Sequence, residues 1–78
     1  MMNTVKTFRL LLNYSQAQVA QRLGISEGSY RAKENGKNKF NELEMYLFVE
    51  LVNERFPDTT VDNIFLSRFR RNQTITNG

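Results

Sequence analysis

Short stretches of helical periodicity run along most of the chain. The first is an apolar stripe at positions i, i+3, i+6 and i+7, formed by Val5, Phe8, Leu11 and Leu12. This spacing predicts a helix that is capped by Thr4, runs to about Asn13 and buries the stripe. Lys6 and Arg9 fall off the stripe, so we expect both to face water or a phosphate. Tyr14, in the link that follows, is expected to pack at a helix junction, with a phosphate contact as the alternative.

The next stretch predicts two short helices joined by a tight turn. Ser15 and Gln18 have the spacing of a capping box at the start of the first helix. Gly24 stands where that helix needs a left-handed C-terminal residue. Ser26 is expected to cap the second helix, which the pair Asn35-Gly36 ends. The inward positions of the first helix are Val19, Ala20 and Leu23, with Ile25 of the turn pointing back into the core.

A longer apolar helix is predicted from residue 42 to about residue 56, with Asn41 as its cap, Glu44 completing a capping box and Pro57 ending it. One of its apolar stripes is formed by Leu43, Tyr46, Leu47 and Leu51. The other is formed by Met45, Phe48, Val49, Val52 and Phe56. A helix that is apolar nearly all round is buried on more than one side. Either this chain covers both stripes, or one stripe makes a subunit contact. Glu50 and Glu54 lie within the first stripe and mark it as the exposed or partner-facing one.

The remainder of the chain adds one short element. Asp58-Thr59-Thr60 reads as a turn with a cap, and a last short helix is indicated by Val61, Ile64 and Phe65. Residues 68–78 show no sustained pattern and are expected to form a flexible basic tail. The sequence therefore predicts an all-α domain of five helices over residues 1–67, followed by that tail.

The two central helices carry a motif. Gln16, Ala20 and Gly24 are spaced four residues apart, and Glu34-Asn35-Gly36 closes the second helix in the same register. In this respect the stretch resembles the helix-turn-helix of the phage repressor and Cro-like family, also called the XRE family. The resemblance implies a compact five-helix, lambda-repressor-like DNA-binding domain, and it implies a phosphate contact for Gln16. Lys33 departs from the family pattern, where a large apolar residue is common. We expect its stem to lie on apolar surface with its amine in water.

Charge is distributed unevenly along the chain. Residues 1–39 hold seven Lys/Arg against two Glu, a net charge of +5. Residues 40–67 hold one Arg against six acids, a net charge of −5, and residues 68–78 add three Arg, so the sum 5 − 5 + 3 is +3. A basic half that contains a helix-turn-helix motif is typical of a protein that binds nucleic acid. The alternative is that these charges are ordinary solvated surface.

The second helix of the motif is the predicted reading helix. If Tyr30 faces the core, the opposite side carries the candidate base-reading residues Glu27, Gly28, Arg31 and Ala32. Arg31 is the one long donor there, and an arginine fork matches O6 and N7 of guanine. Glu27 has the geometry to accept from a cytosine amine or to orient Arg31. The alternative for Arg31 is a solvated ion pair, and the alternative for Glu27 is simple stabilisation of the helix dipole. The candidate phosphate-binding residues are Gln16, Asn35, Lys37, Asn38 and Lys39.

Composition excludes several classes of function. The chain has no cysteine and no histidine, which removes disulfides, thiolate metal sites and the commonest general base. Its carboxylates lack the partners of a catalytic site, so we expect no enzyme activity, no metal and no cofactor. No apolar run approaches the ~18–20 residues of a membrane span, and a cytoplasmic protein is expected.

The functional expectation is a sequence-specific regulator of transcription, a repressor or Cro-like protein borne by a phage or mobile element. It would bind a double-stranded DNA operator as a weak homodimer that forms on DNA. Candidate dimerisation residues are Met45, Phe48, Val52, Phe65, Leu66 and Phe69. The alternative is a protein-binding module of the same fold, which would act as an antirepressor or as the partner of a toxin or regulator.

Overall fold

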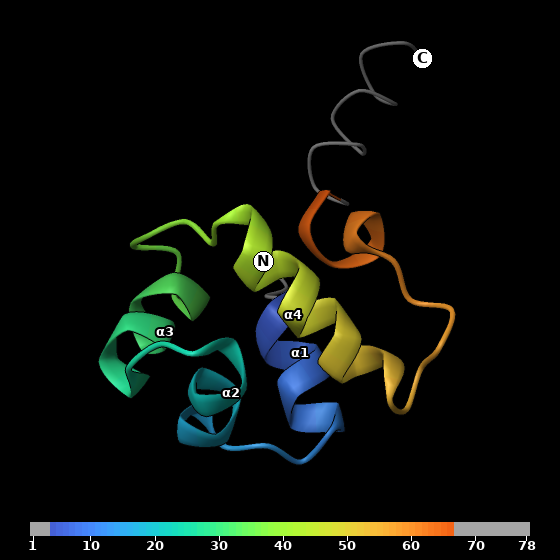
Figure 1. Cartoon of the computed structure of the whole chain (residues 1–78), viewed down its shortest axis with the longest axis horizontal. Coiled ribbons are helices and arrows are strands. Elements are labelled where there is room, and N and C mark those ends of the chain that lie inside the picture. The colour runs from blue at the N-terminus through green and yellow to red at the C-terminus, as the bar shows by residue number, and fades with distance from the viewer. Residues whose placement is uncertain (1–3, 67–78) are drawn as a thin grey trace, which may run out of the picture.

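Five helical elements make up the computed structural model, which describes residues 4–66 (Figure 1). They are α1 (Thr4–Leu11), α2 (Gln16–Leu23), α3 (Glu27–Glu34), α4 (Glu42–Asn53) and the π-helical turn η1 (Asp62–Leu66). No strand occurs within residues 4–66, so the predicted all-α, five-helix architecture is confirmed. The predicted tail, residues 68–78, lies outside the described residues, and so does Phe69.

Local capping chemistry fixes the ends of α2. The Ser15 hydroxyl accepts a hydrogen bond from the backbone N–H of Gln18 at 3.0 Å, and the Gln18 side chain accepts one from the Ser15 N–H at 2.8 Å. At the other end, Gly24 adopts φ = 74°, a left-handed conformation that costs glycine little. The predicted capping box and glycine cap are therefore both confirmed.

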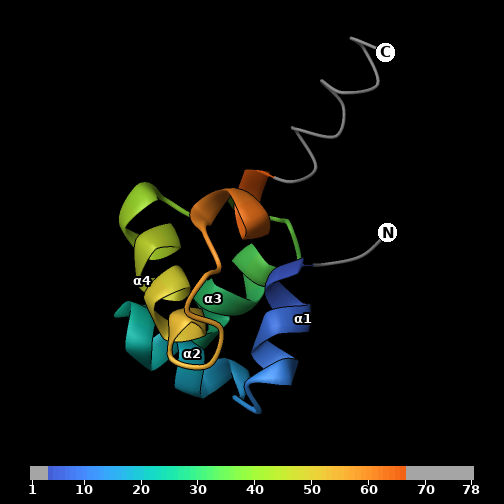
Figure 2. The ribbon, with the colours of Figure 1, turned by 90° about the vertical axis from the view of Figure 1, so that its right-hand side faces the viewer.

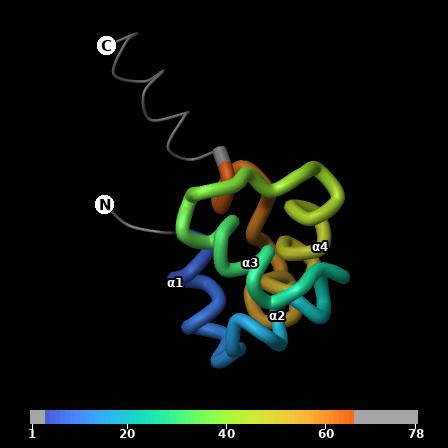
Figure 3. The backbone as a smooth tube through the Cα atoms, turned by 90° about the vertical axis from the view of Figure 1, so that its left-hand side faces the viewer, coloured from blue at the N-terminus to red at the C-terminus, as the bar shows by residue number. Residues whose placement is uncertain are grey.

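The turn after Gly24 delivers the chain directly into α3. Ser26 caps α3 by accepting from the Ser29 N–H at 3.1 Å, and Asn35 ends the helix as its C-cap. The adjoining Gly36 has φ = 87°. Helices α2 and α3 pack against each other, and α3 lies at the surface, as Figure 3 shows with α3 facing the viewer. This is the predicted helix-turn-helix.

The long helix α4 begins as predicted and ends earlier than predicted. The Asn41 side chain accepts from the Glu44 N–H at 2.8 Å and completes the expected capping box. The helix ends at Asn53, three residues before the predicted end, and the N–H groups of Glu54 and Arg55 then donate to the carbonyls of Leu51 and Val52 in the tighter i→i+3 pattern, at 3.2 and 3.1 Å. The Asn53 amide then holds the loop by donating to the carbonyls of Phe56 and Thr59 at 3.0 and 2.9 Å.

The core lies where α2 and α4 meet and is closed by α1 and η1. Its largest fully buried side chains are Tyr30, Phe48, Leu51, Val19 and Val52. Helix α1 packs against η1, and Figure 2 shows η1 across the end of the molecule between α4 and α1. Tyr14 is half-buried against this core, as its predicted packing role requires.

Two predictions about α1 are wrong. Thr4 lies inside the helix rather than capping it, and Leu11 is 53% exposed. Arg9 takes the inward position instead and is only 7% exposed. The reason is helical geometry: Arg9 lies at i+4 from Val5, within the face that also carries Phe8, whereas the i+6 position of Leu11 rotates away.

The structure also corrects the prediction that Phe48 and Val52 of α4 are candidates for a dimer contact. Phe48 and Val52 have no exposed surface, because their stripe packs into the core of the same chain. Neither residue can therefore contact a second folded copy, and both leave the set of dimerisation candidates. The stripe that contains Glu50 is exposed only in part: Leu43 is 65% and Tyr46 57% exposed, whereas Leu47 is half-buried and Leu51 is buried in the core.

The remaining dimerisation candidates are only partly available. Met45 is half-buried, and so is Phe65. The Phe65 ring lies between Phe40 and Phe48, with ring-centroid distances of 5.4 and 6.0 Å. Part of its apolar surface is thus used inside the chain. The side chain of Leu66 lies outside the described part of the chain.

Candidate nucleic-acid interface

A buried ion pair joins α1 to the end of α3. Arg9 Nε donates to Glu34 Oε2 at 2.7 Å, and Arg9 Nη2 donates to Glu34 Oε1 at 3.2 Å. The Tyr30 hydroxyl donates to the same carboxylate at 2.6 Å. Burial alone would raise the pKa of Glu34, but the hydrogen bonds from Arg9, Tyr30 and Gln16 outweigh it and lower the pKa. The prediction that Arg9 faces water or phosphate is therefore wrong.

Gln16 extends this buried pair toward the surface. Its amide nitrogen donates to Glu34 Oε1 at 2.9 Å, and its amide oxygen accepts from Arg31 Nε at 3.1 Å. Gln16 is half-buried at the first turn of α2, where α2 and α3 meet. A single side chain thus links the buried carboxylate of Glu34 to the exposed guanidinium of Arg31.

The outward face of α3 carries the candidate base-reading residues. Arg31 and Glu27 form an i, i+4 ion pair, with Nη2 and Oε2 2.9 Å apart and about half of each side chain exposed (52% and 49%). Gly28 is exposed and a Cβ added there would meet no atom within 4 Å. Ala32 is half-buried. The small residues Gly28 and Ala32 therefore lie on either side of Arg31, the one long hydrogen-bond donor of this face.

A short loop after α3 carries most of the candidate phosphate-binding residues. Asn35, Lys37, Asn38 and Lys39 are all exposed. The backbone N–H groups of Lys37 and Asn38 donate to the carbonyl of Ala32 at 2.8 and 3.3 Å, which ties the start of the loop to α3. The structure thus brings this loop and the outward face of α3 onto neighbouring surface, with Gln16 behind them.

Lys33 lies at the base of this loop in a second nearly buried ion pair. Its ammonium group donates to both oxygens of Glu44 at 2.6 Å, and the two side chains are 14% and 6% exposed. Glu44 Oε1 also accepts from the Asn41 N–H at 2.9 Å. The prediction that the Lys33 amine lies in water is wrong, because α4 presents the carboxylate of Glu44 to it.

These ion pairs change the meaning of the charge distribution. Arg9 and Lys33 are neutralised by Glu34 and Glu44. Arg22 of α2 likewise pairs with Glu54, which also accepts from the Tyr14 hydroxyl. Because Glu34 is already counted in the +5 of residues 1–39, the pairs of Lys33 with Glu44 and of Arg22 with Glu54 compensate two of those five positive charges. The exposed cations beside the outward face of α3 are Arg31, Lys37 and Lys39.

Sequence analysis missed both buried pairs. Arg9 and Glu34 are 25 residues apart and Lys33 and Glu44 are 11 apart, so neither pair follows a local spacing rule. One signal was present for the first pair, since Arg9 lies at i+4 from Val5 and therefore on the helix face that carries Val5 and Phe8, although the predicted stripe did not include it. A charged residue in that register indicates a buried partner.

Acid is expected to destabilise the domain because it protonates the carboxylates of Glu34 and Glu44. Burial would raise the pKa of Glu44, but the bonds from Lys33 and the Asn41 N–H lower it, and the pKa of Glu34 is lowered as well. Because the unfolded chain keeps the ordinary value near 4.5, it binds more protons as the pH falls below that value. Their stabilisation is therefore present above pH 4.5 and is lost on acidification.

Thermal unfolding followed from about pH 6 to about pH 3 measures this loss. The variant Glu44→Gln lacks one of the two carboxylates, so its melting temperature should be lower at pH 6 and should fall less steeply with acid. An acid response equal in slope to that of the unmodified chain would contradict the assignment to Glu44.

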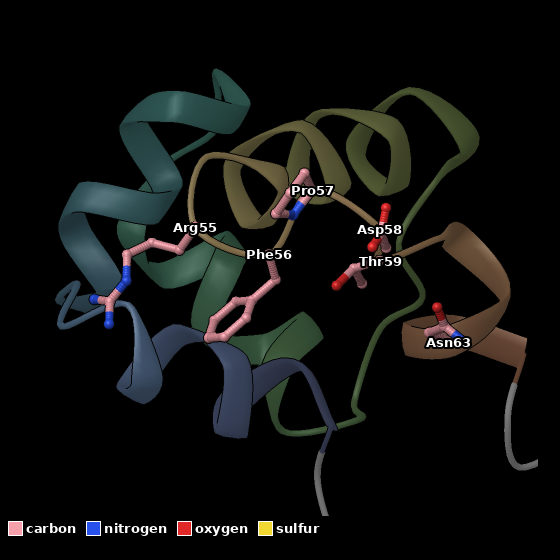
Figure 4. A pocket seen from close by; sticks show the side chains of 6 residues that line it. All are labelled: Arg55, Phe56, Pro57, Asp58, Thr59 and Asn63. Carbon is pink, nitrogen blue, oxygen red and sulfur yellow. The ribbon is translucent and has the colours of Figure 1, made fainter.

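The surface away from α3 offers little chemistry. A depression beside the loop after α4 is lined by Arg55, Phe56, Pro57, Asp58, Thr59 and Asn63 (Figure 4). The Phe56 ring points from it toward α1, where it packs against Phe8 at a centroid distance of 6.0 Å.

Within residues 4–66, no group of three acidic, histidine or cysteine side chains is placed to hold a metal. None of the described helices has the length and apolar character that crossing a membrane requires.

Comparison with known proteins gives one match. A protein-family model described as Helix-turn-helix matches residues 5–55, which is more than half of the chain. The matched region runs from α1 through α4 and contains the outward face of α3 and the loop after it. Searches of curated proteins and of solved structures find no match.

Proposed function

The chain belongs to the XRE/Cro-like helix-turn-helix family, and from this premise we propose that it reads a specific double-stranded DNA operator with α3 in the major groove. Family membership implies DNA binding. The observation that carries the finer proposal is the outward face of α3, where Arg31 is the one long donor and Gly28 and Ala32 leave room for close approach. Two exposed lysines stand in the loop beside it.

In this proposal the residues divide into two roles. Arg31 donates two hydrogen bonds to a guanine edge, and Glu27 accepts from a cytosine amine or orients Arg31. Lys37 and Lys39 attract phosphates, and Gln16, Asn35 and Asn38 are the remaining phosphate candidates. Phosphate contacts set the position of the protein on the duplex, whereas base contacts select the sequence.

Occupying an operator would make the protein a regulator of transcription. A repressor or Cro-like regulator of a phage or mobile element, acting in the cytoplasm, is the form we propose. It needs no catalysis and no cofactor, because binding itself blocks or recruits the polymerase. Selection of bound sequences from a random duplex pool tests this proposal, and recovery of no preferred sequence would contradict it.

Replacing Arg31 and Lys37 separately is expected to distinguish the two roles. Arg31→Ala should cost about 1–3 kcal/mol of binding free energy on the preferred site and relax one base position. Lys37→Ala should weaken all sequences to about the same degree, because a phosphate carries no sequence information. Titration of each variant with the selected duplex and with a random duplex gives the comparison.

Arg22→Ala serves as the control, since Arg22 lies in α2 and pairs with Glu54. Its affinity for both duplexes should match that of the unmodified chain. Equal weakening of the specific and random duplexes by Arg31→Ala would show that the outward face of α3 is assigned wrongly.

Weak self-association and paired binding on DNA are expected for the assembly. One reading helix contacts only about 4–5 base pairs, and two copies on a two-fold symmetric operator, half-sites about 10 base pairs apart, would extend the site. The candidates for this contact are now Met45, Phe65, Leu66 and Phe69. Phe69→Ala should reduce cooperativity while half-site affinity stays largely unchanged.

Sedimentation of the complex measures how many copies are bound. Two copies on a symmetric site are expected, together with a mainly monomeric protein in the absence of DNA. One copy on a site without symmetry would contradict the paired arrangement.

A second candidate function is a protein-binding module. The observation that favours it is the exposed face of α4, where Leu43 and Tyr46 stand between Glu42 and Glu50. Salt-dependent binding to duplex DNA separates the two candidates, because a protein-binding module would retain no such activity.

A further inference from the structure

Two residues at the end of α3 form a chemically reactive pair. Asn35 is exposed and is followed by Gly36, which has no side chain to hinder attack. In such a pair the backbone nitrogen of glycine can attack the side-chain amide carbon of asparagine and close a five-membered succinimide ring. The chain has a second pair of this kind, Asn77-Gly78, which lies outside the described residues. The backbone conformation at Asn35 decides whether the ring can close there.

The conformation of Asn35 holds the two reacting atoms apart. Ring closure requires the Gly36 nitrogen to lie on the same side of the Asn35 Cα–C bond as Cβ. As the C-cap of α3, Asn35 has ψ = −2°, so the Gly36 nitrogen lies instead on the side of the Asn35 nitrogen. The substituents of a tetrahedral carbon are about 120° apart in projection, so closure needs a rotation of that size. The folded end of α3 is therefore unreactive.

Backbone hydrogen bonds oppose this rotation. The Gly36 N–H donates to the carbonyl of Lys33 at 3.1 Å, and the Lys37 N–H donates to the carbonyl of Ala32 at 2.8 Å. Turning the peptide plane between residues 35 and 36 breaks the first bond and displaces the donor of the second. Reaction at Asn35 therefore requires the end of α3 to open.

The buried ion pair limits how often this end opens. Glu34 immediately precedes Asn35, and its side chain is 1% exposed. Its carboxylate accepts from Arg9 at 2.7 and 3.2 Å and from Tyr30 at 2.6 Å. Opening the end of α3 withdraws the carboxylate from these donors, which is costly, so open forms are rare. A contact in the interior thus controls the reactivity of an exposed side chain.

We propose that Asn35 is a deamidation site that the folded end of α3 protects and that opening of this end makes reactive. The Gly36 nitrogen bonds to Asn35 Cγ as its proton passes to solvent, and the side-chain nitrogen takes up a proton and leaves as ammonia. Water then breaks one of the two C–N bonds of the ring. Breaking the bond to Cγ leaves aspartate, and breaking the bond to the backbone carbonyl carbon leaves isoaspartate. No oxidant or reductant is consumed.

The product carries a new carboxylate in the candidate nucleic-acid interface. Lys37 and Lys39, exposed in the same loop, attract phosphates in the proposed function, and this consequence of deamidation rests on that function. An anion beside them compensates one cation, so the slope of log affinity against log salt should become shallower by about 0.9 for each bound copy. Binding to preferred and random duplexes should weaken alike.

Incubation of the full chain in native buffer and in urea, followed by peptide mass spectrometry, measures the reaction at each asparagine. Asn35 should react at least roughly 100-fold more slowly in native buffer than in urea, because only open forms react. Asn38 lies in the same loop but precedes Lys39, whose side chain hinders attack, so it is the internal control and should react more slowly than Asn35 in urea. Equal rates for Asn35 in the two solvents would overturn the proposal.

Substitutions in the interior test what controls the opening. Arg9→Met should speed the reaction at Asn35 in native buffer roughly 100-fold, since it removes the charged donor that holds Glu34. Arg22→Met, which breaks an exposed ion pair, is the matched control and should speed it less than about fivefold. Should Arg9→Met fail to fold, Tyr30→Phe removes one hydrogen bond to the same carboxylate and should give roughly a tenfold increase. A rate no higher than that of the control would overturn the proposal.

The effect on DNA is measured separately from the chemistry. Asn35→Asp supplies the aspartate product in pure form, and its affinity and salt slope on the preferred and random duplexes are compared with those of the unsubstituted chain. Unchanged affinity and slope would overturn the assigned effect on binding. Absence of any duplex binding by the unsubstituted chain at low salt, with Asn35 still protected in native buffer, would reject the proposed function and leave the deamidation site standing.

Discussion

Replacing Arg9 with methionine is expected to lower the free energy of unfolding by about 3 kcal/mol. Removing one partner of a buried ion pair leaves the other charge without compensation, a change that typically costs about 3–5 kcal/mol. We expect the lower end of that energy range because Tyr30 and Gln16 still donate hydrogen bonds to Glu34 in the variant. Urea unfolding, followed by helical circular dichroism, measures the loss.

The exposed pair between Arg22 and Glu54 provides the matched control. Arg22→Met removes one partner of an ion pair whose side chains are nearly half exposed, so it should cost less than about 1 kcal/mol. A similar loss in the two variants would contradict the buried state of Arg9.

Acid should reduce the difference in free energy of unfolding between Arg9→Met and the unmodified chain. Without Arg9, burial dominates and is expected to raise the pKa of Glu34 above its unfolded value. A group with a raised folded pKa stabilises the fold at low pH and loses that contribution as the pH increases. The difference between Arg9→Met and the unmodified chain should therefore shrink as the pH falls toward the ordinary pKa of glutamate. A constant difference would indicate that Arg9 contributes through packing alone.

Affinity for operator DNA is expected to fall about 10³-fold between 50 and 200 mM salt when two copies bind. The exposed cations beside the outward face of α3 are Arg31, Lys37 and Lys39. Each cation that enters the interface, Arg31 at a base as well as the two lysines at phosphates, is expected to release about one counterion, so two copies release about six. The slope of log affinity against log salt should then be about −5.4. A single bound copy should give about −2.7 and a loss of only about 40-fold. The salt series thus reports stoichiometry as well as electrostatics.

Lys37→Ala is the control for that series, because it should reduce the slope by about 0.9 for each bound copy. A slope much steeper than −5.4 would indicate contacts from the arginines of residues 68–78. Binding that does not depend on salt, or no binding at low salt, would contradict the proposed function.

The starts of α2, α3 and α4 and the end of α2 were predicted correctly because the chemistry that sets them is local. The Ser15–Gln18 and Asn41–Glu44 capping boxes each act within three residues, and Gly24 acts through its own backbone. Such features are present in any short window of the sequence. The turn between α2 and α3, and with it the outward face of α3, follows from them.

The errors concern charged residues whose partners are distant in the sequence. Arg9 and Lys33 were placed in water because an unpaired charge avoids the interior. Each has a carboxylate on another helix, and a helix-by-helix pattern contains no information about that partner. The same reason explains why the hydrogen bond from Arg31 to Gln16, two residues 15 positions apart, emerged only from the fold. On α4, Glu50 marked the exposed side only in part, because Leu43 and Tyr46 are exposed whereas Leu51 of the same stripe is buried.

The open space around Gly28 has a consequence for how this protein changes over time. A side chain added at Gly28 meets no atom within 4 Å. Glycine within a helix is also less favourable than other residues by up to about 1 kcal/mol, so most replacements would help α3 form. If α3 reads bases as proposed, a single mutation at Gly28 can change the base preference without a cost in folding.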